Sequence, residues 1–305
     1  MLYGAAVRRI ASATVFPLLL ASAVGGAAWA LGEGLPLDRV LAVTSLASIV
    51  AVALLERLLP FRPEWNRRHG DVLADALYLP TSVGLNGAIE PVARLAGVAV
   101  GSWLSAALGV GLWPATWPLL AQLALACVVA EAFDYWAHRV MHESALLWRF
   151  HATHHSAPRL YWLNATRAHP FEVVLRGIVA FVPLAVAGAG EQLLALYGVV
   201  TIVVGLFQHA NVDTTLGPLS WVFSIGEVHR WHHAPRVAEA NHNYGNNFLF
   251  WDVVFGTRYL PTDRPAPATI GIEGLEAFPT RWLAQLVSPL RWTRIVADSE
   301  SLRTT

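Results

Sequence analysis

Long apolar stretches dominate the first two thirds of the chain. A helix that crosses a bilayer needs about 20 mostly apolar residues. Segments that approach this length are 10–31, 40–55, 92–112 and 118–137. A fifth apolar stretch, 178–207, is interrupted by Gly188, Gly190 and Glu191 and predicts a hairpin of two short helices. The pattern therefore predicts an all-α, polytopic membrane protein with about four transmembrane helices and one short apolar hairpin.

The remaining segments, 138–176 and 208–305, are polar and rich in His and Arg. We expect them to form one helical cap over the membrane stem. No linker of low complexity divides the chain, which predicts a single integrated membrane domain over 1–305. Within it, 1–137 is mainly membrane stem and 138–259 is a histidine-rich region that includes the hairpin 178–207. Residues 260–305 form a C-terminal tail.

The arginines predict the orientation in the membrane, because cytoplasmic loops carry an excess of basic residues. Arg8 and Arg9 precede the first apolar segment, and four more arginines follow the second. These four are Arg57, Arg62, Arg67 and Arg68. We expect the N-terminus and the cap to face the cytoplasm. Every basic residue is arginine and alanine is abundant, which suggests a GC-rich bacterial genome and hence the bacterial inner membrane.

Composition narrows the class further. The chain is 55% hydrophobic and 14% charged, has a formal net charge of +0 and a mean hydropathy of +0.46. No basic block is present to follow a nucleic-acid backbone, so we expect no nucleic-acid partner. Cys127 is the single cysteine, which excludes an intrachain disulfide framework and a cysteine-based zinc site. The excess of 13 Trp and 12 His is typical of a membrane interface and a metal site.

Three groups of histidines have helical spacing. The first has spacing i, i+4, and the second and third have spacing i, i+3, i+4, which places each group on one face of a helix. These eight residues are His138 and His142, then His151, His154 and His155, then His229, His232 and His233. His209 follows the hairpin and is a candidate ninth ligand. Converging groups could surround a pair of metal ions, and imidazole suits Zn, Cu, Fe and Ni.

Four further residues are weaker candidates. Glu131 and Asp134 share a helical stripe with His138, where they could orient imidazoles, ligate directly or only mark the polar end of an amphipathic helix. His169 and His242 are candidates for outer ligands or orienting donors, or are loop residues that pack locally.

The order of these motifs resembles a known family. HRVMH, WRFHATHHS, RAHPFE, FQHANV, EVHRWHHAP and NYGNNFLFWDVVFGTRY occur in sequence between residues 134 and 259. Together they resemble the fatty acid hydroxylase / sterol desaturase superfamily. One departure is Gly205, which stands four residues before His209 where fatty-acyl hydroxylases often carry a paired histidine. In this respect the chain looks closer to the alkylglycerol-monooxygenase-like and bacterial sterol-desaturase-like branches.

The resemblance implies a membrane-bound, non-haem di-iron oxidoreductase that uses O2 at the cytoplasmic face. By position, the implied ligands of the two iron ions are the eight spaced histidines and His209. Zinc could replace iron in a purified sample. The implied reaction is oxidation of a lipid C–H bond: hydroxylation or desaturation of a sterol, fatty-acyl or related lipid, or cleavage of an ether lipid.

Electrons for this reaction must come from another protein. The chain has no haem, flavin or iron–sulfur motif, so we expect a separate donor such as a ferredoxin or a cytochrome b5-type protein. Four arginines of the cap are candidates for its docking surface, although a solvated face is the alternative. They are Arg149, Arg159, Arg230 and Arg236. The pattern makes no prediction of oligomeric state.

Two other functions stay open at this stage. A membrane zinc-dependent hydrolase would need a general base, for which Glu143, Glu172 and Glu227 are candidates, but the sequence has no HExxH motif. A metal transporter would need polar ligands at mid-depth in the membrane, whereas the histidines lie outside the apolar segments.

Overall fold

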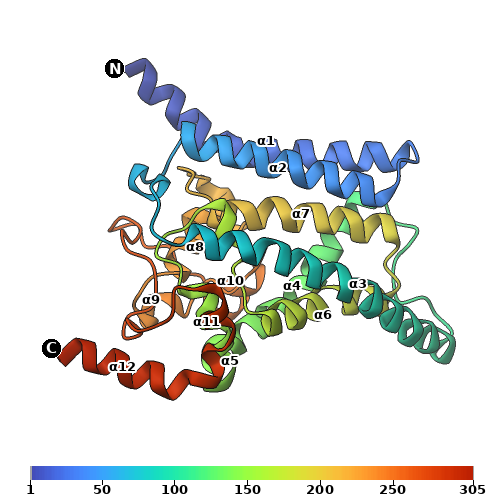
Figure 1. Cartoon of the computed structure of the whole chain (residues 1–305). Helices are drawn as coiled ribbons and strands as arrows, with labels where there is room; N and C mark the ends of the chain where they lie inside the picture. The colour runs from blue at the N-terminus through green and yellow to red at the C-terminus, as the bar shows by residue number, and fades with distance from the viewer. Residues whose placement is uncertain (1, 305) are drawn as a thin grey trace.

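The computed structural model describes residues 2–304, and six long helices form its body (Figure 1). All six are long and apolar enough to cross a membrane. Within residues 2–304 there are two isolated β-bridges and no β-strand, so the predicted all-α membrane class is confirmed. The six are α1 (Leu2–Gly32), α2 (Leu37–Leu58), α3 (Val72–Leu108), α4 (Leu119–Glu143), α6 (Pro170–Ala187) and α7 (Glu191–His209).

Short elements gather at one end of this bundle and form the cap (Figure 1). In the sequence, these short elements occur between the α2–α3 connection and the C-terminus. They are η1 (Pro63–Asn66), α5 (Ala145–His155), η2 (Trp162–Thr166), η3 (Gly217–Trp221), α8 (Gly226–His232), α9 (Val237–Ala240), α10 (Phe250–Phe255), α11 (Trp282–Leu286), η4 (Ser288–Arg291) and α12 (Trp292–Thr304).

The two long helices beyond the predicted four are those of the hairpin, and one other segment begins earlier than expected. Helix α3 starts at Val72 rather than near residue 92, since its first half carries Asp75, Pro80 and Asn86 and does not read as an apolar span. The hairpin consists of helices of 18 and 19 residues. At 1.5 Å per residue each is about 28 Å long, close to the thickness of a bilayer core. Between them, Gly188 ends α6 in the left-handed region (φ 92°), which favours glycine.

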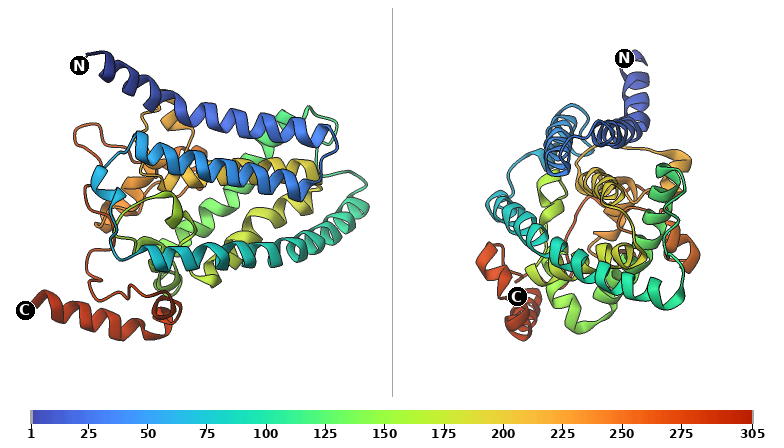
Figure 2. Two further views of the ribbon diagram at one scale, coloured as in Figure 1. Left: turned by 45° about the horizontal axis from the view of Figure 1, so that its top comes forward. Right: turned by 90° about the vertical axis from the view of Figure 1, so that its right-hand side faces the viewer.

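Helix α7 is the central helix of the bundle. Viewed along the bundle axis, the other long helices surround it (Figure 2, right). In its most apolar window 72% of residues are buried, compared with 17–39% for the other five spans. Its apolar side chains join the main core cluster, in which Phe207 meets Phe16 of α1 edge to face at 5.1 Å between ring centroids. Burial therefore fixes the position of His209 at the end of α7.

Helices α3 and α6 approach closely through small residues. A Cβ added at Gly97 would lie 2.7 Å from Cβ of Ala185, and one at Gly101 would overlap the backbone of Val186. Packing of this kind holds helices together in a bilayer, where apolar side chains gain little from leaving lipid. The contact fixes α6, which carries Glu172 beside the histidines.

Two buried ion pairs join the start of α3 to the cap. The Arg159 guanidinium donates to both carboxylate oxygens of Asp71 at 2.7 and 3.0 Å, and Arg167 donates to Asp75 at 2.5 Å. All four side chains are buried. Burial alone would raise the pKa of Asp71, but the hydrogen bonds and charge of Arg159 outweigh it and lower that pKa.

This burial corrects the predicted docking surface for an electron donor. Arg159 is held by Asp71, and Arg230 is buried where it donates to the carbonyl of Val212 at 2.7 Å and stacks on Phe61. Neither guanidinium can meet a partner protein. Their charges serve the fold because carboxylate and carbonyl oxygens inside it need donors.

We expect Asp71→Asn to destabilise the fold by about 3–5 kcal/mol, because it leaves the buried Arg159 charge without its partner. The ion pair contributes its full stability above the pKa that an aspartate has in the unfolded chain. This contribution is lost as the pH falls through the lowered folded pKa of Asp71, so the stabilities of wild type and variant should converge there. The measurement is thermal unfolding in detergent across pH. Asp298→Asn, which removes an exposed i,i+4 pair on α12, is the matched control and should cost under about 1 kcal/mol.

Candidate metal centre

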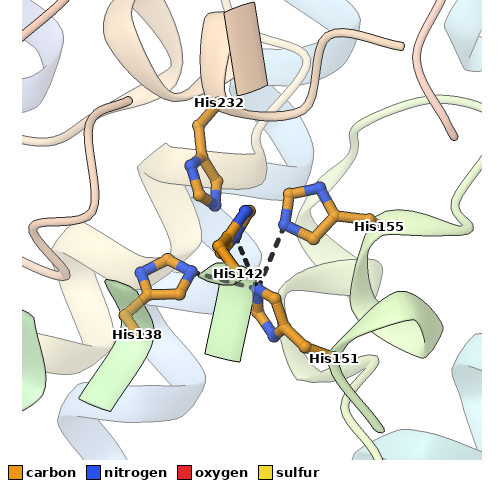
Figure 3. A group of neighbouring side chains, drawn as sticks. All are labelled: His138, His142, His151, His155 and His232. Atoms are coloured by element: carbon orange, nitrogen blue, oxygen red, sulfur yellow. Dashed lines mark hydrogen bonds between the residues drawn. The ribbon is translucent and has the colours of Figure 1, made fainter. Parts of the chain in front are cut away.

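The nine predicted histidines converge into two groups at the cap end of α4 and α7. Candidate ligand atoms within each group all lie within 4.8 Å of one another. Figure 3 shows the larger group, with five rings from α4, α5 and α8 directed toward a common space. The five-histidine group is His138, His142, His151, His155 and His232, and the four-histidine group is His154, His209, His229 and His233.

Each triple histidine motif is divided between the two groups. On α5, His151 and His155 are four residues apart and belong to the five-histidine group, whereas His154 turns to the other group. The motif that starts on α8 is divided in the opposite sense, with His229 and His233 in the four-histidine group and His232 in the five-histidine group. Each motif thus bridges two neighbouring sites, which fits a pair of metal ions.

The nine histidine side chains are largely buried, and their ring nitrogens face one another as the ligands of a metal ion do. Eight of the nine rings are buried, and His142 is half-buried. The Nε2 atoms of His138, His142 and His155 lie 3.1 Å from Nε2 of His151. In the second group, Nε2 of His229 lies 3.3 Å from Nε2 of His209 and 3.0 Å from that of His233. Acceptor nitrogens that face one another so closely fit a shared cation.

A buried nitrogen without a partner supports the same conclusion. Nε2 of His232 has no hydrogen-bond partner although the ring is fully buried, which would be costly unless a metal takes its lone pair. Burial, reinforced by neighbouring imidazoles, lowers the pKa of His151, His155, His229 and His233 well below its usual value. Metals bind neutral imidazole, so the donor set suits a metal pair.

The second ring nitrogen of six histidines is hydrogen-bonded to an oxygen outside the groups. Such contacts fix the tautomer and direct Nε2 inward. The acceptors are Tyr244 O for His138 (2.7 Å), Asn241 Oδ1 for His142 (3.1 Å), Glu172 Oε1 for His151 (2.9 Å), Arg167 O for His154 (3.0 Å), Asn164 Oδ1 for His209 (3.0 Å) and His242 O for His232 (2.8 Å).

Glu131 and Asp134 lie in the layer behind the rings rather than among the ligands. Asp134 accepts from Arg176 at 2.8 and 3.1 Å, and Arg176 lies 3.9 Å from Glu172, the acceptor of His151. Glu131 accepts from the backbone N–H groups of Asn246 and Asn247. Both lie on α4 with His138 and belong to neither histidine group, so an orienting role for them stays a prediction.

The motif WDVVFGT has a structural role in this layer. Asp252 accepts from the backbone N–H groups of Tyr244 and Gly245 at 2.8 and 2.7 Å, and from the hydroxyl of Thr257 at 2.7 Å. Together with Glu131 it holds the loop 244–247 from two sides. That loop presents the Tyr244 carbonyl to His138.

The rings of His169 and His242 are not brought into either group. His169 caps α6, accepting from Phe171 N at 3.1 Å, and its other nitrogen bonds Leu286 O. The His242 ring stacks on Tyr259 at 4.7 Å, and only its carbonyl reaches the site. Sequence reasoning missed Asn164, Asn241 and Tyr244 as orienting residues, because each acts through a single contact that carries no spacing signal.

The predicted hydrolase bases have other partners. Glu143 pairs with Arg139, Glu172 accepts from His151, and Glu227 accepts from the backbone of Leu216. Trp148 packs against the site, with its ring centroid 5.3 and 5.4 Å from those of His142 and His155. Tyr161 is buried and donates to Asp75.

An apolar groove approaches the site along the membrane spans. Its volume is about 740 Å³, and its walls come mainly from α1, α4 and the segments around η3 and α10. Leu120, Ala124 and Val128 line it along α4, and Glu131 lies at its inner end. Seven residues of helix separate Glu131 from His138, which corresponds to about 10 Å. The groove is shaped for hydrocarbon and stops short of the histidines.

Fold and site together define a membrane-embedded protein with two histidine clusters that could hold metal ions, and comparisons with known proteins place it among oxidoreductases. The fatty acid hydroxylase family matches residues 123–257. An ornithine lipid hydroxylase of Rhizobium tropici, OlsE, is 36% identical over 280 residues, which cover 91% of this chain and 83% of the relative. The chain belongs to the fatty acid hydroxylase family, as its motifs predicted.

More distant relatives match less than half of this chain. Methylsterol monooxygenase 1 of Gallus gallus is 28% identical over 47% of this chain and 48% of its own length. Human alkylglycerol monooxygenase is 30% identical over 40% of this chain and 27% of its own length. No solved structure gives a significant match. These relatives support lipid oxidation as the activity.

Removing one ligand should affect one group. We expect His209→Ala to weaken metal binding at the four-histidine group and His232→Ala at the five-histidine group, each leaving about one metal ion per chain. Metal analysis of protein purified from iron-supplemented cells measures this. His169→Ala and His242→Ala are matched controls that should keep two. Equal loss in the control variants would contradict the assignment of ligands.

Glu172→Gln should lower the affinity of the five-histidine group by about 10–100-fold, because a neutral amide supports the His151 imidazole less well than a carboxylate. Competition with a chelator measures the change. Glu143→Gln, on an exposed carboxylate paired with Arg139, should leave affinity unchanged. An unchanged affinity in Glu172→Gln would show that this contact does not tune the site.

Proposed function

We propose that the chain is an O2-dependent di-iron hydroxylase of a membrane lipid. The observation that carries the proposal is the division of nine inward-facing histidines into adjacent groups of five and four. When bound, the two iron ions supply the activation of O2 and the oxidation of a C–H bond, chemistry that side chains do not provide. Zinc could occupy the same nitrogens in a purified sample.

The protein's own part is to hold neutral imidazoles in place and to keep water away. The outer hydrogen bonds from Glu172, Asn164 and the Tyr244 carbonyl preset the ring orientations, so little reorganisation is needed when a metal binds. Burial of the rings limits side reactions of an oxidising centre. The end-of-span position of the histidines also favours an enzyme over a transporter, which needs ligands at mid-depth.

The substrate proposed is an ornithine lipid or a closely related lipid with an amino-acid headgroup. Similarity to an ornithine lipid hydroxylase extends over 91% of this chain, whereas the sterol and alkylglycerol enzymes match less than half. The apolar groove between α1 and α4 is suited to an acyl chain that stays within the bilayer. Hydroxylation is therefore favoured over desaturation and ether cleavage.

The site is proposed to face the cytoplasm of a bacterium, at the inner membrane. The arginines in the first turns of α1 and at and beyond the end of α2 support this orientation. A separate donor, such as a ferredoxin or a cytochrome b5-type protein, would then deliver electrons to the cap. Of the four arginines first suggested for docking, Arg236 remains exposed and Arg149 half-buried, so the docking surface is proposed on their side of the cap.

The test uses iron-loaded protein in lipid nanodiscs that contain ornithine lipid, a reducing system and isotopically labelled O2. We expect a product that carries one labelled oxygen atom, detected by mass spectrometry, and no product without O2. The His154→Ala, His232→Ala double variant is the control and should give none. A product that lacks two hydrogens and contains no label would indicate desaturation, and O2-independent cleavage would indicate a hydrolase.

A further inference from the structure

The two histidine groups differ by one ligand, and the difference lies on α7. We infer that the four-histidine group keeps one ligand position open beside Gly205, where a small exogenous ligand reaches its metal. This inference deepens the proposed function and rests on its two-metal site. Its evidence is the arrangement of the groups and the space around Gly205.

Apart from the ligands that the long helices α4 and α7 supply, the two groups are built in the same way. Each takes a pair of histidines four residues apart from one triple motif and a single histidine from the other. His151, His155 and His232 form this set in one group, and His229, His233 and His154 form it in the other. The five-histidine group adds His138 and His142, one turn apart on α4, whereas the four-histidine group adds only His209 from α7.

Gly205 occupies the corresponding position on α7, one turn before His209. Residues four apart share a helix face, so a side chain at 205 would lie on the face that carries the His209 ligand. A Cβ added at Gly205 would meet no atom within 4 Å, in contrast to Gly97 and Gly101, where α6 fills the space. The missing side chain is therefore not replaced by packing.

The face of α7 that carries Gly205 is also partly exposed. Helix α7 is the most enclosed span, and the neighbours Val204 and Leu206 are buried. Gly205 is nevertheless half-buried, as are Gly198 and Ile202 on the same face. This face lies opposite Val200, which lines the apolar groove. The partly exposed face of α7 that carries Gly205 is therefore separate from the groove.

An open position is what distinguishes a catalytic metal from a structural one. The four-histidine group has it, and the five-histidine group is filled by protein nitrogens. The exogenous ligand is small, of the size of O2 or a triatomic anion. Under this assignment the two metals would have different roles, and a small ligand would bind the four-histidine group on the Gly205 side.

The test uses full-length protein loaded with Co²⁺ and titrated with azide, a small anion whose binding changes the visible absorption of cobalt. We expect wild type with two cobalt ions to bind one azide per chain. Gly205→His, which supplies a fifth nitrogen, should keep two cobalt ions and bind azide at least tenfold more weakly. Gly205→Ala adds only a methyl group and is the matched control, expected to bind azide within about threefold of wild type.

A second variant keeps the test decisive if Gly205→His does not hold two metals. Gly205→Leu fills the same space without a donor atom and should also weaken azide binding at least tenfold. Binding of no azide or of two azides per chain in wild type would overturn the inference, as would unchanged azide binding in Gly205→Leu. Fewer than two cobalt ions in wild type would overturn the two-metal site itself. Normal azide behaviour without lipid hydroxylation would contradict only the proposed activity.

Discussion

Packing of nine imidazoles, eight of them buried, into one small volume is the constraint on which the rest of this structure depends. A buried imidazole must be neutral, and its N–H must find an acceptor while the other nitrogen stays available. The surrounding elements meet this demand with one oxygen each for six of the nine rings, whereas Nδ1 of His229 and of His233 has no partner. Glu172 comes from α6, Asn164 from η2 and the Tyr244 carbonyl from the loop before α10. The cap is thus built around the tautomers of its histidines.

The membrane spans help to position the site, because the residues that orient the histidine rings are linked by hydrogen bonds to the start of α3. Arg167 offers its carbonyl to His154 and its guanidinium to Asp75 of α3. Asn164 accepts from His209 and donates to the carbonyl of Arg159, whose side chain is bound by Asp71. A change at the start of α3 can therefore reach both a ligand of the four-histidine group and the stability of the cap.

Local sequence patterns predicted the candidate metal ligands better than they predicted the membrane spans. Spacing of three and four residues identified eight of the nine histidines that the structure brings together, since each motif encodes its own helix face, and the ninth, His209, was identified by its place after the hairpin. The start of α3 was missed because Asp75 and Asn86 interrupt its apolar pattern, although Asp75 is buried against Arg167. The roles of Arg159 and Arg230 were misjudged because an exposed arginine and a buried, hydrogen-bonded arginine look alike in sequence.

By itself the sequence determined the class of the protein: an all-α membrane chain with histidine motifs of the fatty acid hydroxylase family. Hydrophobic length and residue spacing are local properties, so they can be read without a fold. Only the tertiary structure decided that each triple motif serves two groups, which residues orient the rings, and that the space beside Gly205 stays open. These depend on which segments meet, such as α7 with η2 and α8, and residues far apart in the chain become neighbours only through packing.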